Sequence, residues 1–186
     1  MNSFTDAYEF TSEIKETGVE FLFVSMGQYN IIKAVIYIYV LDHQGKKVYN
    51  LAFGDYDFKT DSLSDDLTTN NGDPYRVYHT VLFTISRFFQ TYEDAMLMVR
   101  GSDSTQKFQD NCHVTCKRKC SPAICRKGHR RISIYRNYID KNFDELAKEY
   151  EFFGDLSNDE NQILTEEYVK GKKYLKIFLK MRKFNL

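Results

Sequence analysis

All four cysteines of this 186-residue chain lie within one short segment, residues 107–131, which we call the basic stretch. Its candidate metal ligands are Cys112, Cys116, Cys120 and Cys125, with His129 or His113 as substitutes. Thiolates and imidazoles bind tetrahedral structural zinc, and neighbouring positive charges lower thiol pKa values. Because the spacing is not the usual paired C-x-x-C, two interpretations stay open. One is a structural zinc site, and the other is a flexible insertion whose reduced cysteines bind nothing.

The basic stretch also concentrates positive charge. It holds eight lysine and arginine residues and one aspartate, whereas the 26 basic and 26 acidic side chains of the whole chain cancel. Cations beside a helix start can hold phosphate through backbone N–H groups, the helix dipole and arginine side chains. We expect Gly101, Ser102, Arg130 and Arg131 to bind an anion there, with nucleic acid or another phosphate-bearing ligand as the partner. The alternative is a solvated loop.

A second charged segment, residues 54–73, is acidic. It contains Asp55, Asp57, Asp61, Asp65, Asp66 and Asp73, with Lys59 as its one basic residue. It does not fit a calcium-binding EF loop, and we expect most of these carboxylates to cap turns and face water. The sequence contains no G-x-S-x-G, P-loop or H-E-x-x-H motif and does not decide whether the protein is an enzyme. If it is one, the catalytic candidates are Asp55, Asp57, Arg131 and Tyr135, because strand ends and helix starts project polar groups from a rigid frame.

Hydrophobic periodicity indicates the elements that position these residues. Apolar spacing predicts a helix over residues 74–92, with Asp73 as N-cap and Pro74 at the first helical position, and a second helix from Arg130 or Arg131 to before Phe152. Strands are expected over residues 8–14, 19–24, 31–41, 46–53, 95–100 and 175–181. Gly54 is expected to stop the fourth of these strands, and residues 155–162 are polar and expected to be exposed.

Strands followed by a helix, a strand, a helix and a terminal strand predict the α+β class. We expect a mostly antiparallel sheet with two long helices packed on it, forming one domain over residues 1–186 with a Cys-rich insertion at 105–129. The first residues show no targeting signal, and the longest apolar run, residues 34–41, is too short to span a bilayer. We therefore expect a cytoplasmic protein without membrane contact, whose thiols stay reduced.

Several motifs resemble one family. They are Tyr8-Glu9-Phe10-Thr11-Ser12-Glu13, Val48-Tyr49-Asn50-Leu51-Ala52-Phe53-Gly54-Asp55-Tyr56-Asp57, Asn70-Asn71-Gly72-Asp73, Gly101-Ser102 and Lys170-Gly171-Lys172-Lys173-Tyr174. In this order, over nearly the whole chain, they resemble the domain of unknown function 6934 family of uncharacterised bacterial proteins. In that family a Gly-Ser-Thr turn leads almost at once into an arginine-bearing helix. Here the insertion separates the two, Arg131 matches the first arginine, and Ser133 stands in place of the second.

The resemblance implies no established activity, so three classes of function stay open. The first is binding of nucleic acid or another phosphate-bearing partner through the basic stretch and the adjacent helix start. The second is a toxin-like enzyme, a nuclease or nucleotidyl-modifying protein, that uses carboxylates of the acidic segment with Arg131. The third is a protein–protein interaction module, in which the charged segments meet a partner such as an antitoxin.

Overall fold

The structure is a computed structural model that describes residues 6–64, 71–115, 120, 125, 127–157 and 162–183. The chain forms two compact units, Met1–Ala95 and Met96–Leu186. Strands within each unit pair antiparallel, so the predicted α+β class with mostly antiparallel pairing is confirmed. The prediction of one domain over the whole chain stays a prediction.

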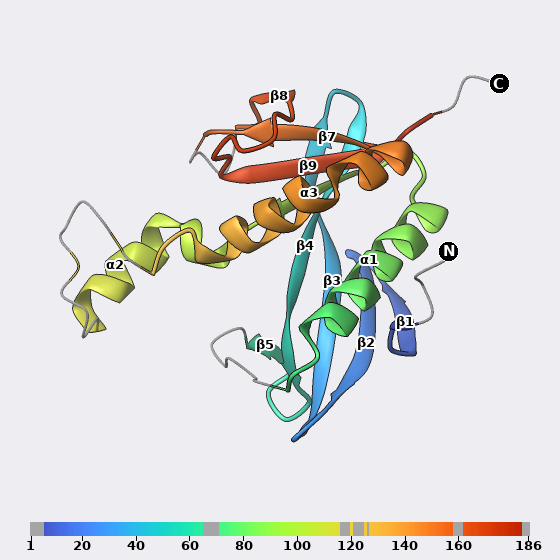
Figure 1. Cartoon of the computed structure of the whole chain (residues 1–186), viewed down its shortest axis with the longest axis vertical. Helices are drawn as coiled ribbons and strands as arrows, with labels where there is room; N and C mark the ends of the chain where they lie inside the picture. Colours follow the sequence, from blue (N-terminus) through green and yellow to red (C-terminus); the bar gives the residue numbers. More distant parts are fainter. Residues whose placement is uncertain are drawn as a thin grey trace. The chain divides into compact units, whose positions relative to one another are not determined.

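The first unit is a strand meander with one helix (Figure 1). Its elements are β1 (Phe10–Lys15), β2 (Gly18–Met26), β3 (Asn30–His43), β4 (Lys46–Asp57), β5 (Ser62–Ser64) and α1 (Pro74–Thr91). Each strand pairs with the next along the chain. Gln44 and Gly45 connect β3 to β4 with φ angles of 50° and 74°. A two-residue hairpin turn of type I′ requires such positive φ angles at both of its central residues.

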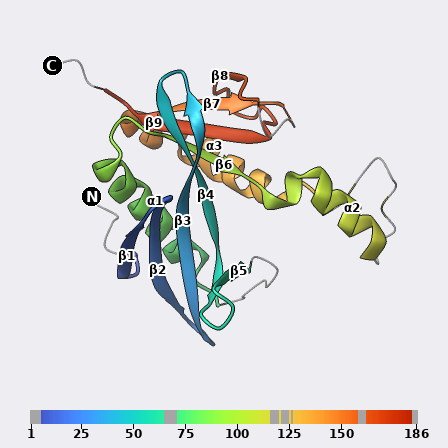
Figure 2. The same ribbon diagram turned by 180° about the vertical axis from the view of Figure 1, so that it is seen from behind.

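Helix α1 covers one face of the strands β2 and β3, and Figure 2 shows the same strands from the opposite side. The centre of this contact is aromatic, because the ring of Tyr37 on β3 stacks on Phe88 of α1 with centroids 4.5 Å apart. The Tyr37 hydroxyl shares a hydrogen bond of 2.9 Å with Thr84. Burying an aromatic side chain of this kind stabilises a fold by about 1.5–3 kcal/mol. The packing of its apolar face therefore holds α1 against the strands.

The second unit contains a sheet in the order β6-β9-β7-β8 and two helices. Its elements are β6 (Met96–Arg100), the 3-10 helix η2 (Ser102–Ser104), α2 (Gln106–Thr115), α3 (Arg130–Glu149), β7 (Tyr150–Asp155), β8 (Thr165–Glu167) and β9 (Lys176–Met181). Phe143 of α3 packs against Phe152 of β7 and the ring of Tyr168, with centroid distances of 5.7 Å in both cases. These aromatic contacts join α3 to the sheet.

In the first unit two local predictions were wrong. Strand β4 continues through Gly54 to Asp57, where it pairs with β5, and a Cβ at Gly54 would lie 2.7 Å from the Ser64 backbone carbonyl oxygen, so glycine allows this close approach. Asp73 precedes α1 as predicted, yet its side chain makes no capping hydrogen bond to the helix. Its carboxylate binds residues of other elements instead.

In the second unit the terminal strand was predicted correctly, and several features were not. The apolar spacing of α3 continues through Tyr150, so the sequence did not indicate that β7 begins there. The short elements α2 and β8 were also missed. Asp155 was expected to be exposed and is completely buried. It pairs with Lys176 at 3.3 Å, and both side chains come from neighbouring strands, β7 and β9.

Candidate functional site

The four predicted anion-binding residues lie at the start of α3 or next to the 3-10 helix η2. The Arg131 guanidinium donates a hydrogen bond to the Ser102 hydroxyl. The backbone N–H groups of Arg130 and Arg131 donate to Asp103 Oδ2 at 2.8 and 3.0 Å. Two of the N–H groups expected to hold phosphate are therefore occupied by a carboxylate of the same chain.

Asp103 is the residue that the sequence prediction missed. It is 4% exposed and caps α3 from a position 27 residues before Arg130. A negative charge at a helix N-terminus is stabilised by the helix dipole, so this carboxylate substitutes for an external anion. A Cβ at Gly101 would lie 2.5 Å from Asp103 Oδ1, so the glycine makes room for the cap. Any phosphate at this end of α3 must therefore be recognised mainly by side chains.

Three cationic side chains of the basic stretch are exposed, one near the start of α2 and two at or next to the start of α3. They belong to Lys107, Lys127 and Arg130. Among the described residues none of the three has an ion-pair or side-chain hydrogen-bond partner. The one aspartate of the stretch, Asp110, accepts a hydrogen bond of 2.8 Å from Gln106. Lys117, Arg118, Lys119 and Arg126 lie outside the described residues.

The other arginine near the start of α3 has a structural role. Arg136 donates to the backbone carbonyl of Tyr174 at 2.9 Å and to the Ser133 hydroxyl at 2.7 Å. It therefore ties α3 to the segment before β9. Tyr135, a predicted catalytic candidate, is half-buried on α3.

The acidic candidates of the first unit have partners within that unit. Asp55 on β4 forms an ion pair with Lys33, its register partner on β3, and the two side chains are 13% and 9% exposed. Asp57 Oδ1 accepts the backbone N–H of Lys59 at 2.8 Å and thereby shapes the turn after β4. Asp61 accepts a hydrogen bond from the Tyr56 hydroxyl, which, with burial, raises the pKa of Tyr56 to about 12. Asp65 and Asp66 lie outside the described residues.

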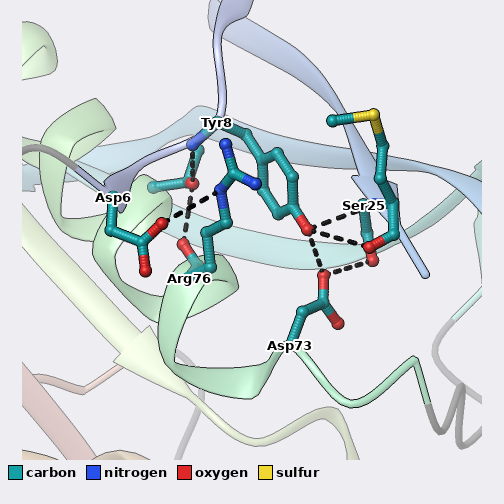
Figure 3. A network of polar contacts seen from close by, with 7 residues as sticks. Asp6, Tyr8, Ser25, Asp73 and Arg76 are labelled. Atoms are coloured by element: carbon teal, nitrogen blue, oxygen red, sulfur yellow. Dashed lines mark hydrogen bonds and ion pairs between the residues drawn. The ribbon is translucent and has the colours of Figure 1, made fainter.

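A polar cluster lies at the start of α1, and Figure 3 shows its hydrogen bonds and ion pair. Asp73 Oδ2 accepts hydrogen bonds of 2.7 Å from both the Tyr8 and the Ser25 hydroxyl groups. The Arg76 guanidinium lies over the Tyr8 ring at 4.0 Å from its centroid, and its Nε is 3.5 Å from Asp6 Oδ1. This cluster, which we call the α1 clasp, joins the N-terminal segment, β2 and α1.

Electrostatics favour the ionised form of Asp73 in the clasp. Burial raises the pKa of this carboxyl, but the hydrogen bonds from Ser25 and Tyr8 and the charge of Lys33 outweigh that effect, so its pKa lies below the usual value. Burial and the hydrogen bond to Asp73 raise the pKa of Tyr8. The pair therefore stays as carboxylate and phenol over the neutral range.

Asn71 extends the clasp to the turn between β2 and β3. Its amide donates to the Ser25 hydroxyl at 2.9 Å and to the Tyr29 carbonyl at 2.8 Å, and its Oδ1 accepts the Tyr29 N–H at 3.1 Å. Because Asn71 satisfies both backbone groups of Tyr29, it acts there as a neighbouring strand would. Of the two motif residues, Asn71 thus positions backbone and Asp73 binds two side-chain hydroxyls, and neither is presented to solvent as an isolated reactive group.

Three of the four predicted cysteine ligands, together with His129 and His113, are among the described residues, whereas Cys116 lies outside them. Cys112 is buried on α2, and Cys120 and Cys125 are half-buried. His129 adopts the left-handed conformation, φ 60°, immediately before α3. Within the described part of the chain, no group of three or more His, Cys, Asp or Glu side chains is arranged to hold a metal ion.

Comparison with known proteins gives one match. A family model with the description "Family of unknown function" matches residues 5–109. The match contains the motifs up to Gly101-Ser102, whereas the cysteines and Lys170 to Tyr174 lie beyond it. No curated protein and no solved structure matches. None of the helices in the described segments has the length and apolar character needed to cross a membrane.

Proposed function

The chain belongs to the domain of unknown function 6934 (DUF6934) family, whose description names no activity, and from this premise we propose that it binds nucleic acid through the basic stretch. The observation that carries the proposal is the exposure of Lys107, Lys127 and Arg130 without an anionic partner among the described residues. Exposed cations on a locally basic segment are the usual electrostatic contact with a phosphate backbone.

The placement of the carboxylates supports this proposal. Asp103, the acidic residue beside the stretch, is buried as the cap of α3, where the helix dipole offsets its charge. Asp110 is held by Gln106. Asp110 is the one acidic residue among the eight lysines and arginines of the stretch, so positive charge predominates there. Because the helix N–H groups are occupied, these side chains supply the phosphate contacts, and binding depends on charge more than on base sequence.

A charge-reversal experiment tests the proposal. Fluorescence anisotropy with labelled single-stranded RNA and double-stranded DNA compares the wild type with Lys127→Glu/Arg130→Glu. The matched control is Lys141→Glu/Lys173→Glu, which makes the same charge change at two other exposed positions of the second unit. We expect the first variant to lose at least tenfold in affinity and the control to lose much less. The slope of log K against log salt should also shrink by about 2, at about 0.9 per lost phosphate contact on duplex DNA.

Two outcomes would count against nucleic-acid binding. One is the absence of binding at low salt, and the other is binding that both double variants reduce equally. For the enzyme alternative, the carboxylates of Asp55 and Asp57 already have partners in their own unit, so no observation favours it over binding.

A further inference from the structure

The strand β1 is the outermost strand of the first unit (Figure 2). Among the described strands, only β2 pairs with it. All of its residues after Phe10 are exposed. An edge strand presents a row of backbone N–H and C=O groups along its outer side, and a strand from another molecule can add there. The outer side of β1 is therefore a surface at which the sheet can be extended.

The pairing pattern shows which residues of β1 direct their backbone groups outward. The N–H of Tyr39 on β3 donates to the Thr17 carbonyl at 2.8 Å, just before β2 begins. Because alternate residues of an antiparallel strand bond to the same neighbour, the odd-numbered residues of β2 bond to β3 and the even-numbered ones to β1. The partners of these even-numbered residues on β1 are Thr11, Glu13 and Lys15. The residues of β1 whose backbone groups face away from β2 are therefore Phe10, Ser12 and Ile14.

The side chains of these outward-facing residues border a groove between β1 and α1. Its volume is about 730 Å³, and its lining includes Ile14 of β1 and Phe83 and Arg87 of α1. The Phe10 ring contacts the Phe83 ring, with centroids 5.9 Å apart. Ile14 is 70% exposed, although an isoleucine side chain gains stability from burial. A strand added to β1 directs every second side chain toward this groove.

The sequence around β1 is complementary to itself when two copies run antiparallel about Ser12. In this register Glu9 opposes Lys15 of the second copy, and Phe10 opposes Ile14. Opposite charges and apolar side chains that face each other stabilise paired strands, whereas like charges destabilise them. Glu9 is exposed, and Lys15, which bonds to Glu20 of its own copy at 3.0 Å, has three N–H donors and can bond to both carboxylates.

The other registers match less well. A pair centred on Thr11 places Glu9 opposite Glu13, and a pair centred on Glu13 places that residue opposite itself. Centring on Ile14 overlaps only residues 13–15 of the two strands. The register about Ser12 also brings the outward backbone groups of both copies face to face.

We propose that β1 is the interface of a symmetric dimer, in which β1 of a second copy adds antiparallel about Ser12. Each edge then closes the other, and Ile14 of each copy lies beside Phe10 in the groove of its partner. A two-fold axis at Ser12 makes the contact self-complementary, as in most homo-oligomers. Because each copy contributes only a six-residue strand, we expect a dissociation constant in the micromolar range. This inference goes beyond nucleic-acid binding and does not rest on it.

Sedimentation velocity of the full chain over a series of concentrations measures the dimer. Ser12→Pro removes an outward N–H group and keeps the bonds to β2, so it should abolish dimerisation without unfolding the edge strand. The matched control Ser12→Ala keeps the N–H group and should dimerise as the wild type does. Ile14→Asp, which puts a charge into the groove, should also abolish the dimer, whereas Tyr29→Asp at another exposed position of the first unit should not. Circular dichroism checks that each variant is folded.

Two charge reversals test the register. Glu9→Lys faces Lys15 of the second copy and should weaken the dimer, less so at high salt. Glu13→Lys faces Thr11 and should leave the dimer unchanged. If Glu13→Lys alone weakens it, the register about Ser12 is wrong. The interface itself is overturned by a dimer that Ser12→Pro and Ile14→Asp leave intact. It is also overturned if the wild type stays monomeric at millimolar concentration, which would leave the edge for a strand of another protein.

Discussion

Asp103 accepts the backbone N–H of Arg130 and so fills, from within the chain, the position at which a helix would otherwise hold an external anion. Its carboxylate is buried, and the N–H of Arg131 donates to the same oxygen. At the start of α3, the backbone N–H groups and the cationic side chains therefore differ in their partners. The start of α3 is satisfied internally, while the side chains of Lys127 and Arg130 beside it are exposed.

The first prediction concerns the Asp103 cap. Asp103→Ala leaves two N–H groups at the start of α3 without their acceptor, so we expect it to lower the free energy of unfolding by about 1–2 kcal/mol. Urea denaturation followed by circular dichroism measures this. Asp110→Ala, which removes an exposed aspartate of α2, serves as the control and should change stability by less than about 0.5 kcal/mol. Equal effects of the two substitutions would contradict the buried cap.

The second prediction concerns the α1 clasp. Tyr8→Phe removes the hydroxyl that donates to Asp73 and leaves the ring beneath Arg76 in place. We expect a loss of at least about 1 kcal/mol in the free energy of unfolding, because the part-buried hydrogen bond to the Asp73 carboxylate disappears together with the hydrogen bonds between the hydroxyl and the Met26 backbone. Tyr75→Phe, at a side chain that is 71% exposed, is the matched control and should be neutral. A neutral Tyr8→Phe would mean that the clasp contributes nothing to stability.

The third prediction follows from the lowered pKa of Asp73. Its folded-state pKa lies below the unfolded value of about 3.9, so its stabilising contribution is complete above that value and is lost as the pH falls through the folded-state pKa. The stability difference between the wild type and Asp73→Asn should therefore be largest near neutral pH and should shrink below about pH 4. Urea unfolding at a series of pH values measures it. If the stability difference instead grows as the pH falls, the pKa of Asp73 is raised in the folded state and not lowered.

The fourth prediction concerns the ion pair of β7 and β9. Lys176→Met removes the partner of the completely buried Asp155, and an uncompensated buried charge typically costs about 3–5 kcal/mol. Lys180→Met on the same strand breaks the more exposed pair with Glu151 and should cost less than about 1 kcal/mol. The comparison uses denaturant midpoints of both variants. If the two losses are alike, Asp155 is not buried as a charged group.

The local pattern of residues in the sequence determined most of the helices and strands of this protein and the place of its basic stretch. The spacing of apolar side chains predicted the two long helical segments and most strands, because periodicity depends on neighbours along the chain. Composition alone located the basic stretch and its cysteines. The helix end at Tyr150 could not be read in this way, since the apolar spacing of α3 continues smoothly into β7.

Tertiary structure decided which polar groups meet. Asp73 was placed correctly before α1, but its partners Tyr8 and Ser25 lie 65 and 48 residues away. Asp103 and Asp155 gave no signal of burial, because an aspartate is stable inside a protein only when a distant segment supplies its donors or its cation. Sequence determines the elements and the distribution of charge, whereas the packing of distant segments determines which carboxylates are satisfied internally and which cations stay exposed.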